Sequence, residues 1–210
     1  MCNICGATSL EKAHELYIGG LERGSFASGF LAFTKNHFML LKQETPFEFE
    51  YLQKEIKQSL DEFVIYYLFH SRAPTNSKNL SFDYCTTHPF NFGFNFVAHN
   101  GIIQNFTDFG NHKEFDVDSS IIPYHLTANN GDIIKTYSKY KGLLTSWIYN
   151  TEKLYLVKAG SSLHMDQDSF SSTSFEGSHI VEEDGIVYEF NGLKFDLLGR
   201  FDYKNPYFIL

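Results

Sequence analysis

The first forty residues alternate apolar and polar positions in a way that predicts a strand, a helix and a hairpin. Residues 2–8 form a short apolar run, which is typical of a strand. Ser9 is a suitable N-cap, and apolar residues then recur at helical spacing over 10–17, up to a glycine pair that ends the helix. The apolar runs 26–33 and 38–41 flank a polar turn and therefore predict a hairpin.

A second amphipathic helix and a buried strand follow. One face of this helix carries only apolar residues: Phe49, Leu52, Ile56, Leu60 and Phe63. Residues 63–69 are continuously apolar, β-branched or aromatic, which predicts a strand buried on both faces. His70, Ser71 and Arg72 come at the end of this strand, where polar side chains commonly build a functional site.

The middle of the chain predicts a long loop and another strand. Residues 74–91 are rich in Thr, Ser, Asn and Pro and predict a loop. Residues 92–98 predict an aromatic strand that ends at His99-Asn100-Gly101. Taken alone, the Asn-Gly pair is a turn signal, and each histidine is most simply a structural residue.

Two short helices and a series of hairpins complete the chain. Asp118 or Ser119 is expected to cap a helix through 121–126, and 132–140 predicts a further helix. Hairpins are expected over 143–157, 180–190 and 190–198. No internal repeat or linker is visible, so residues 1–210 are expected to form a single domain.

Composition and charge exclude several classes of protein. With 43% hydrophobic and 20% charged residues among 210, the chain is typical of a globular protein. The 22 Phe and 13 Tyr predict an aromatic core or an apolar surface that meets a partner. The net charge of −8, without a basic run, argues against nucleic-acid binding. No apolar run is long enough for a membrane span and no signal peptide is visible, so no membrane partner is expected.

Cys2 carries the first chemical signal. If Met1 is removed, Cys2 bears both a thiol and the free α-amine of the chain, so one residue is nucleophile and base together. An α-amine has an ordinary pKa of about 7.7–8.0 and is partly neutral near pH 7. Cys2 and Cys5 also form a C-x-x-C pair, which suits a redox site or half of a zinc site, but no second such pair exists. No metal is therefore predicted, and three thiols favour a reducing, cytoplasmic compartment.

Six short blocks in order resemble the class II glutamine amidotransferase domains of the N-terminal-nucleophile (Ntn) hydrolase superfamily. The opening resembles M-C-G-I-x-G, and later blocks resemble R-G-x-D-S-A-G, H-T-R-W-A-T, an H-P pair, H-N-G-x-I-x-N and [T/S]-D-[S/T]-E. The blocks in this chain are Met1–Gly6, Leu21–Gly29, His70–Thr75, His88-Pro89, Val97–Asn105 and Asp118–Ile121. The H-N-G block is the closest match.

The resemblance implies an α+β fold, a four-layer αββα sandwich with two mostly antiparallel sheets. It implies hydrolysis of L-glutamine to L-glutamate and ammonia through a thioester on Cys2, without a cofactor. Removal of Met1 is expected, because small second residues usually permit it. By resemblance, the Asn100 side-chain amide and the Gly101 N–H form the oxyanion hole.

Glutamine is a zwitterion, so its selection requires one cation and one anion set apart. Arg72 suits the α-carboxylate, because its planar fork binds a carboxylate through two hydrogen bonds. Asp118 suits the α-ammonium. By resemblance, Thr75 and the backbone of Ala73 complete the substrate site.

The blocks also depart from the family pattern, which predicts a divergent member. The departures are Asn3 for Gly, Phe26 for Asp, Ala73 for Trp, Pro74 for Ala and Ser120 for an acid. None of them removes a group of the core mechanism. They alter the surroundings of the site, and the chain is expected to be slow or to need a partner to order it.

Two other functions stay open on sequence grounds. One is a catalytically silent glutamine-binding regulatory module, which would bind glutamine without releasing ammonia. The other is an Ntn amidase for another γ-glutamyl amide, which would prefer a related substrate. No acceptor (synthase) domain is visible, so ammonia is expected to pass to a separate acceptor subunit, or the chain acts as a free-standing glutaminase.

Overall fold

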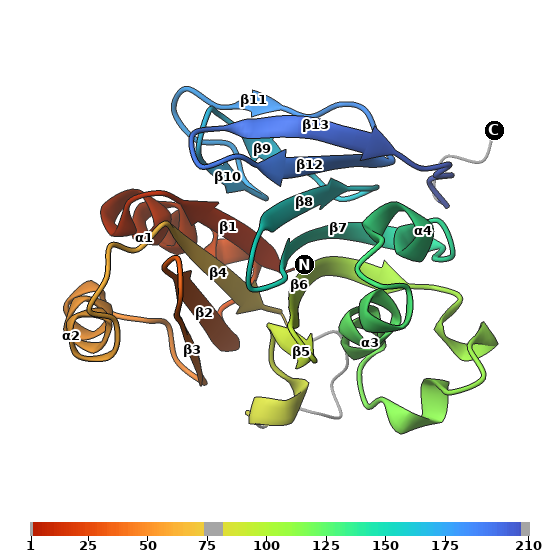
Figure 1. Cartoon of the computed structure of the whole chain (residues 1–210), viewed down its shortest axis with the longest axis horizontal. Helices are drawn as coiled ribbons and strands as arrows, with labels where there is room; N and C mark the ends of the chain where they lie inside the picture. The colour runs from red at the N-terminus through yellow and green to blue at the C-terminus, as the bar shows by residue number, and fades with distance from the viewer. Residues whose placement is uncertain (1, 74–81, 207–210) are drawn as a thin grey trace. The chain divides into compact units, whose positions relative to one another are not determined.

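The computed structural model describes residues 2–73 and 82–206 (Figure 1). It divides into two compact units, each with its own sheet. The first unit comprises Met1–Pro89 and His164–His179, and the second comprises Phe90–Leu163 and Ile180–Leu210. One predicted substrate residue, Thr75, lies outside the described residues.

The sheet of the first unit has seven strands in the order β11-β9-β10-β1-β4-β2-β3. Their bounds are β1 Asn3–Ala7, β2 Ala27–Phe33, β3 Phe38–Gln43, β4 Tyr66–Arg72, β9 His164–Met165, β10 Phe170–Ser171 and β11 His179–Ile180. The pairs β1–β4, β2–β4 and β2–β3 are all antiparallel. The predicted strand at 2–8 and the hairpin over 26–41 are confirmed.

Two helices belong to this sheet. Helix α1 (Leu10–Gly19) packs against β1 and β4, and Ser9 caps it by accepting a hydrogen bond from the Lys12 N–H, as predicted. Helix α2 (Phe49–Ser59) packs beside α1. The core between helices and sheet is rich in aromatic rings, among them Tyr17 stacked on Phe69 with centroids 4.6 Å apart.

The predicted boundary between α2 and the following strand is wrong at Phe63. The helix ends at Ser59 and β4 begins only at Tyr66, so Phe63 lies between them and belongs to neither element. Its side chain is 86% exposed. The helix ends about one turn earlier than the apolar pattern indicated, because the backbone becomes extended at Leu60.

The second unit contains a six-stranded sheet in the order β13-β12-β8-β7-β6-β5. Its strands are β5 Phe90–Phe92, β6 Asn95–Ile103, β7 Gly142–Tyr149, β8 Leu154–Lys158, β12 Ile186–Phe190 and β13 Phe195–Arg200. Every pair of neighbours is antiparallel. Helix α3 (Ile121–Ala128) packs against β5 and β6, and α4 (Ile133–Tyr137) packs against α3.

Two sequence predictions for this unit need correction. Strand β6 does not end at residue 98 but continues through His99-Asn100-Gly101 to Ile103, because β7 pairs with it over its last eight residues. The predicted hairpin over 180–190 is also wrong, since β11 pairs in the other sheet and β12 pairs with β8 and β13.

Both sheets are antiparallel and both carry helices, so the predicted α+β class with two antiparallel sheets is confirmed. Among the described residues, no helix combines the length and apolar character that crossing a membrane would require. Within the same residues, no group of three or more His, Cys, Asp or Glu side chains is arranged to hold a metal ion.

Candidate active site

The proposed nucleophile and the proposed carboxylate ligand lie at the same end of two adjacent strands in the first unit. Strand β1 runs antiparallel to β4, with Asn3 opposite Ser71. Cys2 precedes Asn3 and Arg72 follows Ser71, so both residues come at this end of the strand pair. Ala27, the first residue of β2, is opposite Arg72 on the other side of β4. Three strands therefore bring their site segments together.

Arg23 contacts the backbone of Cys2. Its Nε donates a hydrogen bond to the Cys2 carbonyl oxygen at 3.2 Å. Burial lowers the pKa of the Arg23 guanidinium, while the negative charge of a Cys2 thiolate acts in the opposite direction. Arg23 belongs to the R-G block but was not among the predicted site residues. Its place directly before Gly24 in that block was the available signal.

The Arg72 side chain is held in place by the segment before β2 and the segment after the undescribed stretch. Its Nη1 donates to the Thr86 hydroxyl at 3.5 Å, and its guanidinium carbon lies 5.8 Å from the centre of the Phe26 ring. Its carbonyl oxygen accepts a hydrogen bond from the Phe26 N–H at 2.9 Å. Phe26 replaces the acid of the family pattern, so an aromatic ring takes the position from which a carboxylate could have paired with Arg72.

Gly24 of the R-G block lies against the backbone of Ala73, and this contact explains why the position requires a glycine. A Cβ placed on Gly24 would lie 2.4 Å from the Ala73 backbone nitrogen. The two backbones therefore approach more closely than any side chain would permit. This contact fixes the backbone of Ala73, a predicted substrate residue.

Residues 82–89 cross the same sheet. The carbonyl oxygen of His88 would lie 1.9 Å from a Cβ on Gly29, so a glycine in β2 permits the crossing. The His88 ring packs against the ring of His70 in β4, with centroids 4.0 Å apart and the ring planes tilted by 32°. The H-P block and the H-T-R block of the sequence thus meet through two buried imidazoles.

Asn3 is another departure from the family pattern. Its side chain occupies space that is open because residue 20 is a glycine. Its side chain is fully buried, and its Nδ2 lies 3.7 Å from the Cys5 sulfur as a hydrogen-bond donor. A Cβ on Gly20 would lie 1.9 Å from the Asn3 Nδ2. The end of α1 therefore provides the space for the larger residue that follows Cys2.

The oxyanion-hole candidates Asn100 and Gly101 lie in β6 of the second unit. Asn100 is opposite Thr145 of β7 and is buried. A Cβ on Gly101 would lie 1.8 Å from the carbonyl oxygen of Leu143. Only glycine fits at this position, because the neighbouring strand occupies the volume of any side chain.

His99 connects this strand to the segment that carries Asp118. Its Nε2 lies 2.7 Å from the Leu143 carbonyl oxygen and its Nδ1 lies 2.8 Å from the Ser119 hydroxyl. A carbonyl only accepts, so Nε2 carries the proton and Nδ1 accepts from Ser119 in the neutral ring. Burial lowers the pKa of His99, and the nearby Asp118 charge and the Leu143 carbonyl offset this only in part. His99 is therefore neutral, and its two hydrogen bonds connect the Leu143 carbonyl to the Ser119 hydroxyl.

Asp118 begins a 3₁₀ turn, Asp118–Ser120, and does not cap helix α3. One carboxylate oxygen accepts a hydrogen bond from the Ile103 N–H at 2.6 Å, and the other lies 3.3 Å from the Ser119 hydroxyl oxygen, whose single proton is directed at the nearer His99 Nδ1. The prediction of a helix cap is wrong, because the carboxylate binds the end of β6. Asp118 is thus fixed in the same unit as Asn100 and Gly101.

The structure distributes the predicted site residues between the two units. Cys2, Arg72 and Ala73 belong to the first, and Asn100, Gly101 and Asp118 belong to the second. Residues that the sequence did not assign are Arg23 and Thr86 in the first unit and the pair His99–Ser119 in the second. Thr86 has no sequence signal, because only the folded chain brings it to Arg72.

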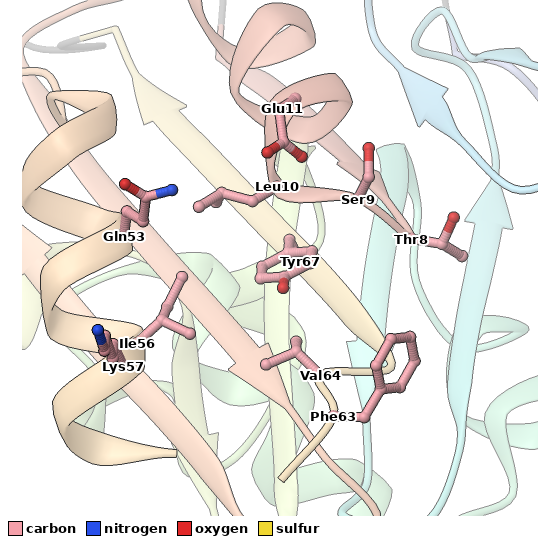
Figure 2. Close-up of a pocket in the computed structure, with 10 residues that line it drawn as sticks. All are labelled: Thr8, Ser9, Leu10, Glu11, Gln53, Ile56, Lys57, Phe63, Val64 and Tyr67. Atoms are coloured by element: carbon pink, nitrogen blue, oxygen red, sulfur yellow. The ribbon is translucent and has the colours of Figure 1, made fainter. Parts of the chain in front are cut away.

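A pocket of about 380 Å³ in the first unit contains none of these residues (Figure 2). It lies between the start of α1, the face of α2 that carries Ile56, and β4. Its lining is Thr8, Ser9, Leu10, Glu11, Gln53, Ile56, Lys57, Phe63, Val64 and Tyr67. Tyr67 is opposite Ala7, at the other end of the β1–β4 pair from Cys2. The pocket is therefore separate from the candidate active site.

No protein-family model and no curated protein matches this sequence significantly. Solved structures do match the fold. Glutamine phosphoribosylpyrophosphate amidotransferase from B. subtilis, solved with ADP and GMP, aligns with a TM-score of 0.71 and 17% identity over 96% of this chain and 49% of its own. A structure described as the allosteric regulatory enzyme of purine biosynthesis aligns with a TM-score of 0.71 and 19% identity, over 97% and 50%.

A third structure, a glutamine aminotransferase class-II domain protein from Silicibacter pomeroyi, aligns with a TM-score of 0.59 and 11% identity over 96% of this chain and all of its own. The chain spans about half the length of the two enzymes above. The chain therefore has the fold of class II glutamine amidotransferase domains, as the sequence resemblance predicted.

Proposed function

We propose that this chain hydrolyses L-glutamine to L-glutamate and ammonia, with Cys2 as the N-terminal nucleophile. The observation that carries the proposal is the meeting of Cys2 and Arg72 at one end of adjacent strands, within the fold of the amidotransferase structures. A thiol and a fixed guanidinium are the two groups that attack on a carboxamide and binding of an amino-acid carboxylate require. Arg23, bonded to the Cys2 carbonyl, holds the nucleophile-bearing residue in place.

In the proposed reaction the Cys2 thiol loses its proton to its own α-amine, and the thiolate attacks the γ-carboxamide carbon of glutamine. The protonated amine then gives its proton to the leaving ammonia, and water hydrolyses the resulting thioester. This cycle requires that Met1 be removed, because an amide nitrogen is not a base. Neither a metal nor another cofactor takes part.

The remaining roles are proposals from the sequence blocks. Asn100 and Gly101 supply the oxyanion donors, and Asp118 binds the α-ammonium of glutamine. Support comes from the second unit itself, where Gly101 is obligatory and Asp118 is held by β6. Arg72 binds the α-carboxylate, and Ala73 and Thr75 complete the site.

The ammonia is proposed to reach a separate acceptor subunit. The two purine-related structures extend over about twice the length that this chain matches, so their chains contain more than this domain. The three cysteines are thiols without a disulfide, which fits the cytoplasm as the expected compartment.

The proposal is tested by glutamate release from L-glutamine by the purified protein, with intact mass to establish that Met1 is absent. Cys2→Ala should abolish release, and Cys5→Ser should leave it nearly unchanged because Cys5 is buried in the core. Equal release by wild type and Cys2→Ala would refute the proposal.

Two alternatives give different results in the same experiment. A catalytically silent regulatory module would bind glutamine in a titration, would lose that binding in Arg72→Ala, and would release no glutamate. An Ntn amidase for another γ-glutamyl amide would turn over that amide faster than glutamine, and would still require Cys2.

A further inference from the structure

Lys42 lies on β3, the last strand of the seven-stranded sheet, beside the segment that crosses the sheet. Its Nζ donates a hydrogen bond to the Tyr84 carbonyl oxygen at 3.1 Å and lies 4.4 Å from the centre of the Tyr84 ring. That carbonyl belongs to the peptide bond between Tyr84 and Cys85. The amine is therefore anchored on the peptide group that precedes Cys85.

The position of Cys85 is fixed by the short 3₁₀ turn Tyr84–Thr86. Asp83 caps this turn by accepting a hydrogen bond from the Cys85 N–H at 2.8 Å. The Thr87 hydroxyl donates to the Asp83 carbonyl oxygen at 2.8 Å and closes the turn. Cys85 is exposed and forms no disulfide. A small reagent in solution can thus reach a thiol whose backbone is held beside Lys42.

The Lys42 amine is also suited to act as a nucleophile. Burial lowers the pKa of Lys42 to about 8, and the opposing charges of Cys85 and Asp83 offset only part of this effect. An ordinary lysine has a pKa of about 10.4 and is almost fully protonated near neutral pH. A much larger fraction of Lys42 is neutral, and only the neutral amine attacks a carbonyl.

We propose that Cys85 and Lys42 form an acyl-transfer site that takes an acyl group from a small thioester and fixes it on Lys42. In the first step the Cys85 thiolate attacks the thioester carbonyl, a new C–S bond forms, and the original thiol leaves as a thiolate. In the second step the neutral Lys42 amine attacks the Cys85 thioester, a C–N bond forms and the C–S bond breaks. The amine proton passes to the Cys85 thiolate. No redox partner is required.

Acylation would remove the charge that holds Lys42 against the Tyr84 carbonyl and ring. The next residue after Cys85 is Thr86, whose hydroxyl accepts from Arg72. The modification therefore acts on the segment that supports Arg72. The acyl-transfer site itself uses no residue of the proposed glutamine chemistry, so the two proposals fail or succeed separately.

The test exposes the full-length protein to acetyl-CoA at pH 8 and follows acetylation of each lysine by peptide mass spectrometry. Lys54 and Lys57 of α2 are exposed lysines of the same chain and serve as internal references. Lys42 should be acetylated at least about tenfold faster than either. Equal rates at the three lysines would overturn the proposal.

A second pair of proteins tests the relay through the thiol. Cys85→Ser keeps a side chain of similar size but removes the thioester intermediate, and should slow Lys42 acetylation about tenfold while leaving Lys54 and Lys57 unchanged. Lys42→Arg should accumulate the acyl group on Cys85 as a hydroxylamine-sensitive thioester. Unchanged Lys42 acetylation in Cys85→Ser, or no thioester on Cys85 in Lys42→Arg, would contradict the relay. Glutamate release is measured separately and does not enter either comparison.

Discussion

The carbonyl oxygen of Leu143 accepts a hydrogen bond from Nε2 of His99 at 2.7 Å. The same oxygen occupies the place where a Cβ on Gly101 would stand, 1.8 Å away. The contacts of this one oxygen thus explain why the H-N-G block has a histidine at position 99 and a glycine at position 101. The histidine fixes the neighbouring strand, and the glycine makes room for it.

Gly101→Ala should therefore be strongly destabilising. The added Cβ meets backbone of a paired strand, which cannot move aside as a flexible side chain would. We expect a loss of about 3 kcal/mol or more in the free energy of unfolding, measured by urea denaturation. Gly110→Ala is the matched control, because a Cβ there meets nothing within 4 Å, and it should change stability by less than about 0.5 kcal/mol.

The lowered pKa of His99 predicts a pH dependence of stability. The folded state resists protonation of His99, whereas the unfolded chain takes up a proton below the ordinary value of 6.5. Stability from neutral His99 is therefore complete above pH 6.5 and is lost as the pH falls toward the lowered folded pKa. The slope for one proton is at most about 1.4 kcal/mol per pH unit.

His99→Gln removes this titration and provides the control. The difference in unfolding free energy between wild type and variant should shrink as the pH is lowered through this range. The other histidines are present in both proteins and cancel in the comparison. A difference that stays constant with pH would show that His99 is not held neutral.

Asn3 and Gly20 should be energetically coupled. Gly20→Ala places a Cβ 1.9 Å from the Asn3 amide nitrogen and should cost about 1–3 kcal/mol, whereas in an Asn3→Ala background the same change should cost much less. Gly19→Ala, where a Cβ meets nothing within 4 Å, should be neutral or stabilising. Thermal or urea unfolding of the four proteins in the double-mutant cycle measures the coupling, and strict additivity would contradict the contact.

Arg72→Lys should raise the KM for glutamine by about tenfold or more and lower kcat less. A lysine keeps the positive charge but cannot bind a carboxylate through two parallel hydrogen bonds. Steady-state kinetics on L-glutamine separates the two constants. Thr86→Ala, which removes the hydroxyl partner of Arg72, should raise KM by a smaller factor. An unchanged KM in Arg72→Lys would remove Arg72 from the substrate site.

Local patterns predicted much of the fold because local chemistry determines those elements. Ser9 caps α1 through a hydrogen bond three residues away, and the hairpin of β2 and β3 follows from two apolar runs and one turn. The extension of β6 through Asn100-Gly101 could not be predicted in this way. An Asn-Gly pair favours a turn locally, and the pairing with β7 overrides that preference.

In the candidate site, too, some residues were predictable from local sequence and others depend on contacts made only in the folded chain. Cys2, Arg72, Asn100, Gly101 and Asp118 came from ordered blocks in the sequence. Thr86, in contrast, contacts Arg72 only because the segment after the undescribed residues returns across the sheet. The space for Asn3 comes from Gly20, at the far end of a helix, and no local signal connects the two.

The most direct test of the central claim is to treat the processed protein with a glutamine analogue that carries a diazoketone in place of the carboxamide, and to map the adduct by peptide mass spectrometry. We predict an adduct on the Cys2 thiol of a chain without Met1, prevented by excess L-glutamine, unaffected by Cys5→Ser and lost in Cys2→Ala. No adduct on Cys2 of the processed chain, or labelling of Cys2 that glutamine does not slow, would contradict the proposed role of Cys2.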